Sequence, residues 1–230
     1  MIREVLSRKT LPVFSAFFFW SFGTGGLWLV RPLFAFEIGG TFLLVALISS
    51  ASVVPRVVIG PITGYLTDRF GRRKFVVIGA ALHIAALIGD FFVQSYLPFL
   101  LLEIVAGTGI AVYMTSANVL MADTTRTGTR GRAVAARQVS NRMGNFAGPV
   151  VAGLIAAAFG LRYVFLFIAF TKLMVIIVAL LFIKEIREPK TPQIAKTSNV
   201  RTSRIPDLTM FKSKTFLSLA LGTVALGLVN

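Results

Sequence analysis

The chain has 230 residues, of which 56% are hydrophobic and only 14% are charged. Soluble domains carry about 25% charged residues, so this composition argues against a water-soluble fold and excludes intrinsic disorder. The formal net charge is +15, but the basic residues form short clusters between long apolar runs, and no continuous basic surface for nucleic acid is expected.

Reactive side chains are scarce. The chain has no cysteine and one histidine, so it has neither thiolate ligands nor a histidine cluster that could bind zinc. The patterns H-E-x-x-H, G-x-S-x-G and G-x-x-x-x-G-K-[ST] are also absent. The sequence therefore predicts that the protein is not an enzyme and holds neither a metal nor a cofactor.

Six apolar runs are long enough to cross a bilayer as helices, which takes about 20 residues. They cover residues 11–36, 42–66, 75–93, 97–121, 139–158 and 161–183. The first run is too long for a cleaved signal peptide and no small-residue cleavage site follows it, so we expect a retained span. A seventh run covers 215–230, about 24 Å of helix against a core of about 30 Å, so we expect the printed sequence to stop inside a helix.

The basic residues alternate between the connections. Lys and Arg number 3 before the first run, 4 between the second and third, 4 between the fourth and fifth, and 8 in residues 184–214, whereas the intervening connections hold only Arg162. Cytoplasmic loops carry this excess, so the N-terminus is predicted to be cytoplasmic. Residues 184–214 also contain Pro189, Pro192 and Pro206, which predicts a cytoplasmic linker between a 1–183 membrane domain and a second half that starts at 215.

Between the second and third runs, residues 64–74 read G-Y-L-T-D-R-F-G-R-R-K. This string resembles the signature G-x-L-x-D-R-x-G-R-R/K of the major facilitator superfamily at every fixed position. The six runs and the long basic loop are also similar to the N-terminal half of that family. The resemblance implies an all-α, polytopic membrane protein, with a six-transmembrane-helix N-terminal bundle and the start of a seventh helix.

The residues of this motif suggest separate roles. Gly64 permits close approach of another helix, and Gly71 permits a tight turn. Asp68 ends its own helix, where a negative charge is unfavourable, so it is expected to serve another group. The resemblance implies that Gly64, Asp68, Arg69, Gly71 and Arg72 form a gate latch between the two halves; the alternative is that the charges only anchor the topology.

A second string, G-N-F-A-G-P-V-V-A-G, covers residues 144–153 in the fifth run. It looks like the antiporter signature G-x-x-x-G-P-x-x-G-G of the same family, with Ala152 as the departure. Gly144, Gly148 and Gly153 are expected to allow close packing of helices, and Pro149 is expected to bend this one.

Polar side chains inside the runs are expensive and mark candidate sites. Helical spacing places Ser21, Thr24, Trp28 and Arg31 on one stripe, and the other three stripes comprise Ser52 and Arg56; Glu103, Gly107, Ile110, Met114 and Asn118; and Gln138, Asn141, Asn145 and Gly148. We expect these stripes to form one polar seam. The candidates for binding substrate or a proton are Thr24, Trp28, Arg31, Arg56, Glu103, Asn141 and Asn145.

Glu103 stands where related proton antiporters carry an arginine, so arginine-based proton handling is in doubt. A carboxylate at low dielectric can bind a proton or a cationic substrate, but an ion pair with Arg31 or Arg56 explains Glu103 equally well. For His83 we expect a hydrogen-bonded packing role. For Lys172 we expect snorkelling or an internal pair, and for Arg162 an outer interfacial anchor.

The resemblance implies a secondary active transporter that exports drugs or metabolites by alternating access, with protons as the coupling ion. A facilitator or symporter of an organic anion or sugar is the alternative, and a non-transporting fragment would follow if the natural chain ended at residue 230. The expected partners are a small-molecule substrate, the lipid bilayer and the missing C-terminal half, with no nucleic acid. The expected location is the plasma membrane, as in a bacterial inner membrane.

Overall fold

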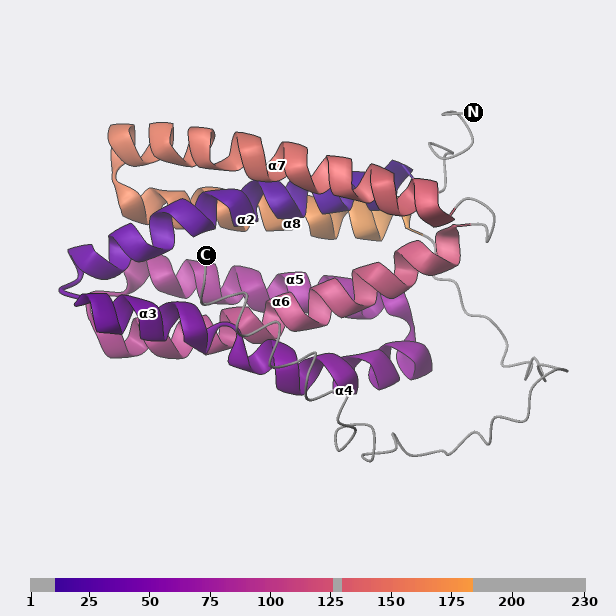
Figure 1. Ribbon diagram of the computed structural model, residues 1–230, viewed down its shortest axis with the longest axis horizontal. Coiled ribbons are helices and arrows are strands. Elements are labelled where there is room, and N and C mark those ends of the chain that lie inside the picture. The colour runs from indigo at the N-terminus through magenta and orange to yellow at the C-terminus, as the bar shows by residue number, and fades with distance from the viewer. Residues whose placement is uncertain (1–10, 126–129, 184–230) are drawn as a thin grey trace, which may run out of the picture. The chain divides into compact units, whose positions relative to one another are not determined.

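The computed structural model describes residues 11–125 and 130–183. Its helices are α2 (Leu11–Glu37), α3 (Phe42–Ala51), α4 (Val54–Phe70), α5 (Arg72–Phe92), α6 (Tyr96–Thr124), α7 (Arg130–Phe159) and α8 (Leu161–Phe182) (Figure 1). The linker predicted over 184–214 and the helix start predicted over 215–230 lie outside these residues. Within them, α3 and α4 together form one of six segments long and apolar enough to cross a membrane. The six-span, all-α prediction is therefore confirmed.

Two features differ most from the predictions. The span predicted as one helix over 42–66 is interrupted at Ser52 and Val53, because Pro55 has no amide hydrogen to continue the helical hydrogen bonds and is instead accommodated in the first turn of α4. The fifth span begins at Arg130, not at residue 139. Hydropathy detects only the apolar part of a helix, whereas the preceding Ala and Arg residues extend it with good helix propensity.

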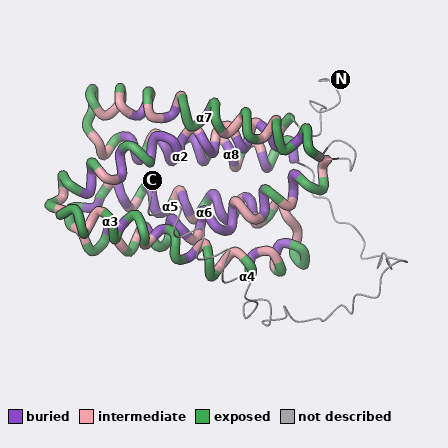
Figure 2. The backbone as a smooth tube through the Cα atoms, in the orientation of Figure 1, coloured by how far each residue is buried: buried purple, intermediate pink, exposed green. Residues whose placement is uncertain are grey.

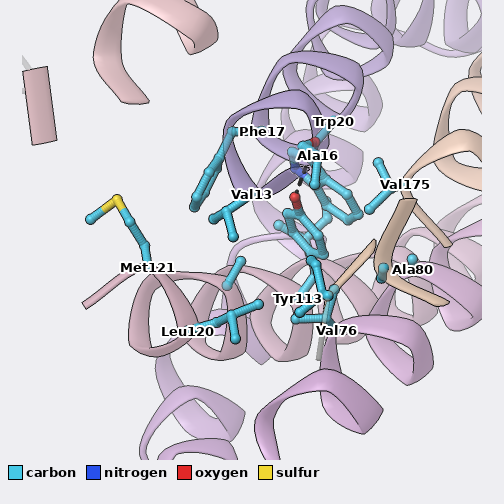
Figure 3. Packing of buried hydrophobic residues seen from close by; sticks show 14 residues of the cluster. Val13, Ala16, Phe17, Trp20, Val76, Ala80, Tyr113, Leu120, Met121 and Val175 are labelled. Atoms are coloured by element: carbon cyan, nitrogen blue, oxygen red, sulfur yellow. Dashed lines mark hydrogen bonds between the residues drawn. The ribbon is translucent and has the colours of Figure 1, made fainter. Parts of the chain in front are cut away.

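The packed interior lies among α2, α5, α6 and α8, whereas α7, α3 and α4 are more exposed (Figure 2). In one apolar cluster, the rings of Trp20 and Tyr113 are stacked with centroids 3.5 Å apart, and the Tyr113 hydroxyl donates to the Ala16 carbonyl at 3.2 Å (Figure 3). In a second cluster, Phe34 contacts Phe99 and Phe165 edge to face. These aromatic contacts fix α2 against α6 and α8.

Candidate functional site

A buried ion pair joins α2 to α6. Arg31 Nε donates to Glu103 Oε1 at 2.7 Å, and the two side chains are only 9% and 1% exposed. Arg31 Nη1 also lies 3.5 Å from the hydroxyl of Ser52 at the break between α3 and α4. Gly107 allows this arrangement, since a Cβ atom there would collide with the Ser52 backbone. The ion pair that the sequence offered as one explanation of Glu103 is therefore present.

Two further charged residues belong to the same region. Arg56, in the first turn of α4, interacts electrostatically with Arg31 and Glu103, and its buried Nε has no hydrogen-bond partner among the described residues. Asp90, near the end of α5, is fully buried and interacts with the same pair. Sequence reasoning missed Asp90, although it lies inside the span predicted over 75–93, where the rule for intramembrane charges would have selected it.

Thr24 and Lys172 form a separate contact between α2 and α8. Lys172 is fully buried, and its Nζ donates to the Trp20 carbonyl at 2.5 Å and to the Thr24 hydroxyl at 2.9 Å. The same nitrogen lies 4.2 Å from the centre of the Trp20 ring. Of the two placements expected for Lys172, snorkelling is wrong and an internal one is present, because backbone, hydroxyl and ring contacts hold the amino group inside the bundle. The Thr24 hydroxyl, a predicted binding group for substrate or a proton, is the acceptor of this Lys172 hydrogen bond.

His83 is also buried, and it packs beside Trp20 with ring centroids 5.3 Å apart. The expected packing role is confirmed. The expected hydrogen bond is wrong, since neither ring nitrogen has a partner among the residues that the structure describes. A Cβ atom on Gly109 would lie 2.7 Å from the His83 backbone nitrogen, so α5 and α6 are in backbone contact at this point.

The polar face of α7 is exposed and hollowed. A depression of about 580 Å³ is lined by Gln138, Asn141, Arg142, Asn145 and Phe146. Asn141 also accepts a hydrogen bond of 2.9 Å from Ser21 on α2. Trp28 is 70% exposed and does not line this depression. The structure thus divides the predicted seam into the Arg31–Glu103 region, the Lys172–Thr24 contact and the α7 depression.

Glycines bring α2 and α7 into backbone contact. A Cβ atom on Gly144 would lie 2.7 Å from the Phe18 carbonyl oxygen, and one on Gly148 would collide with the Phe22 carbonyl. Gly153 makes no such contact, because its nearest neighbour would be a Leu29 methyl group at 3.9 Å. The predicted close packing is confirmed at two of the three glycines. Helix α7 continues through Pro149.

The latch motif lies at the junction of α4 and α5. Gly71 has φ of +103°, which confirms the tight turn, while Gly64 has room for a Cβ atom 4.0 Å from the nearest side chain, Thr115. Gly64 therefore makes no close helix contact within the described residues. Arg72 lies 3.7 Å from the largely exposed Asp68 and also pairs with Asp123 at the end of α6, a partner that sequence reasoning missed. Arg69 lies over the Phe70 ring.

Comparison with known proteins agrees with this architecture. A family model described as Major Facilitator Superfamily matches residues 13–230. Multidrug resistance proteins MdtG of Salmonella arizonae and Salmonella newport are each 27% identical over 173 residues, which cover 71% of this chain and 43% of those proteins. The chain thus spans less than half the length of these relatives.

Two solved structures share the fold. The human organic anion transporter MFSD10 aligns with a TM-score of 0.64 at 18% identity, over 77% of this chain and 47% of its own. The peptide transporter POT in complex with sulfate aligns with a TM-score of 0.67 at 16% identity, over 95% and 45%. With six apolar helices and a family model that spans most of its length, the chain belongs to the Major Facilitator Superfamily of membrane transporters.

Proposed function

We propose that this chain is the N-terminal half of a secondary transporter that exports small organic solutes in exchange for protons by alternating access. The single observation that carries the proposal is the buried Arg31–Glu103 pair between two helices of a transporter bundle. Buried ionisable groups at membrane depth are costly, and transporters retain them where charge or protons must be carried. The name of the 27% identical relatives, multidrug resistance protein, supports export of drug-like solutes.

The α7 depression supplies the solute-contacting surface in this proposal. Amide side chains at Gln138, Asn141 and Asn145 can accept and donate hydrogen bonds to varied solutes, and Phe146 adds an apolar contact. The missing half would cover this face and the exposed apolar residues beside it, which include Met143 and Val150. Residues 184–214 would then be the cytoplasmic linker, 215–230 the first part of the seventh helix, and the N-terminus cytoplasmic in a bacterial inner membrane.

A gradient-collapse assay tests proton exchange. Everted vesicles that contain the full-length protein should accumulate the cationic dye ethidium when their interior is acidic, and a protonophore should abolish that accumulation. Vesicles without the protein are the control. Dye movement that is unchanged after collapse of the pH gradient would refute proton exchange and indicate a facilitator.

An organic anion carrier is the second candidate, and Arg142 favours it. This arginine is exposed in the α7 depression, whose other lining residues are uncharged. A guanidinium there would pair with a carboxylate or phosphate. Efflux of carboxyfluorescein that survives gradient collapse and falls in an Arg142→Gln variant would support this candidate over cation export.

We further propose that Asp68 acts as a gate latch toward the missing half. Its side chain is 66% exposed and 3.7 Å from Arg72, so Asp68→Asn should change the free energy of unfolding by less than about 1 kcal/mol. Transport should nevertheless fall about tenfold, as a shift of roughly 1.4 kcal/mol between two conformations would produce. Dye accumulation and thermal unfolding of the purified variant measure both effects.

Asp123→Asn provides the comparison for this latch experiment, because it removes the other acidic partner of Arg72, at the end of α6. Wild-type transport rates in Asp68→Asn, or equal losses of stability in the two variants, would contradict the latch role of Asp68.

A further inference from the structure

Asp90 is a buried acid that has no role in the transport mechanism proposed above. It lies in the last turn of α5 with a relative exposure of 0%, and neither carboxylate oxygen has a hydrogen-bond partner among the described residues. Burying an ionised carboxylate without a hydrogen bond or a paired charge is among the costliest changes in a protein interior. A carboxyl group in such surroundings is stable when it carries a proton.

The packing of α5 against α6 brings Asp90 near Glu103. A Cβ atom on Gly89 would lie 2.8 Å from the side-chain carbons of Leu102, so the residues that precede Asp90 and Glu103 are in direct contact. Asp90 also interacts electrostatically with both Glu103 and Arg31. Two acids from adjacent helices therefore share one buried region with a single arginine from α2.

The hydrogen-bonding capacity of this region is only partly used. Arg31 Nε contacts Glu103 Oε1, but Arg31 Nη2 and Glu103 Oε2 are both buried and without a partner in the described part of the chain. Arg31 can therefore accept a second carboxylate without losing the first, because its guanidinium presents five N–H donors in a plane. Asp90 is the acid in this region whose two carboxylate oxygens both lack a partner among the described residues.

The other charged groups around Asp90 do not serve as the basic partner of its carboxylate. On α4, Arg56 interacts with Arg31 and Glu103, and it is not among the charges that act on Asp90. On α8, Arg162 donates to the Phe91 carbonyl at 3.2 Å and lies over the Phe34 ring, while Lys172 is held by Trp20 and Thr24. On α5 itself, His83 lies about two turns earlier and packs against Trp20.

We propose that Asp90 and Glu103 form a proton-binding acid pair bridged by Arg31, with Asp90 as the residue that holds the proton. In the protonated state Asp90 is neutral and Arg31 pairs with Glu103 alone. When the O–H bond breaks, the proton passes to water, the electron pair stays on the Asp90 carboxylate, and Arg31 Nη2 becomes its partner. Loss of the proton thus draws α2 toward α5, which links proton release to helix position. The part that this step plays in transport rests on the proposed proton exchange.

Infrared difference spectroscopy of the full-length protein tests the assignment directly, with the proton itself as the probe. The absorption band of a protonated carboxyl group, identified by its shift in heavy water, should be lost on titration to alkaline pH. Asp90→Asn should remove this band, and Asp90→Glu should restore a band at an altered frequency. Glu37→Gln, which changes an exposed acid at the end of α2, is the matched control and should leave the band in place.

The outcomes separate this inference from the proposed function. A titrating band that survives in Asp90→Asn with unchanged intensity would overturn the assignment, and so would its absence from the wild-type protein. If the band behaves as expected but no dye is driven by a pH gradient, the proton site stands and the proposed exchange fails. If both hold, Asp90→Asn should lose proton-driven accumulation and retain passive equilibration of the dye.

Discussion

Replacing Glu103 by Gln together with Asp90 by Asn should lower the free energy of unfolding by about 3–5 kcal/mol, the cost of leaving a buried charge without its partner. The Arg31 side chain is only 9% exposed and cannot lose its proton, so it would keep only the Ser52 hydroxyl 3.5 Å away. Denaturant or thermal unfolding of the detergent-purified protein measures the change.

The single variants make this experiment specific. Asp90→Asn alone should have a small effect, because it replaces a neutral acid by an amide of similar shape. Glu103→Gln alone should cost less than the double variant, since Asp90 can release its proton and pair with Arg31. Adding Arg31→Met to the double variant should recover most of the loss, because the buried charge is then gone. A double variant no less stable than Glu103→Gln alone would show that Asp90 does not interact with Arg31.

Gly148→Ala should destabilise the bundle by about 1–3 kcal/mol, because the added methyl group has no space between two backbones. Its Cβ atom would collide with the Phe22 carbonyl and lie 3.0 Å from the Gly26 nitrogen. Neither neighbour is the end of a flexible side chain, so α2 and α7 must separate. Unfolding in detergent and the accessibility of Phe22 to labelling after replacement by Cys both report this separation.

Gly153→Ala is the matched control in the same helix. Its Cβ atom would have its nearest contact at 3.9 Å, so the substitution should be neutral or stabilise by up to about 1 kcal/mol through better helix propensity. Equal losses of stability in the two variants would contradict a packing role specific to Gly148.

The spans were predictable because apolar length alone identifies a membrane helix, and the turn at Gly71 because its motif demands it. The break at Ser52 was less visible, since apolar residues continue on both sides and only Pro55 signals it. Thr24 and Trp28 illustrate the limit of face assignments. Both lie on one stripe of α2, yet Thr24 contacts α8 while Trp28 is exposed.

The reason is that α2 packs against several helices, among them α6, α7 and α8, so positions within one broad stripe meet different neighbours. Spacing in the sequence shows which residues share one face of a helix, but it does not show which neighbouring helix packs against each of them. For the same reason the pairing of Arg31 with Glu103 was one of two explanations until the helices were placed. Asp123 is different, because it stands near the end of its span and the sequence carries no signal that its partner is Arg72 at the start of the preceding helix.

The buried amino group of Lys172 has a consequence for how the protein enters the membrane. A lysine near the middle of an isolated helix opposes insertion by about 2.5–3.5 kcal/mol. In this bundle the groups that satisfy it, the Trp20 carbonyl and the Thr24 hydroxyl, belong to α2, which the ribosome makes long before α8. Helix α2 therefore has to remain at the insertion machinery, or return to it, when α8 arrives. Biogenesis of the bundle thus depends on contact between α2 and α8, the two of its described spans that lie farthest apart in the sequence.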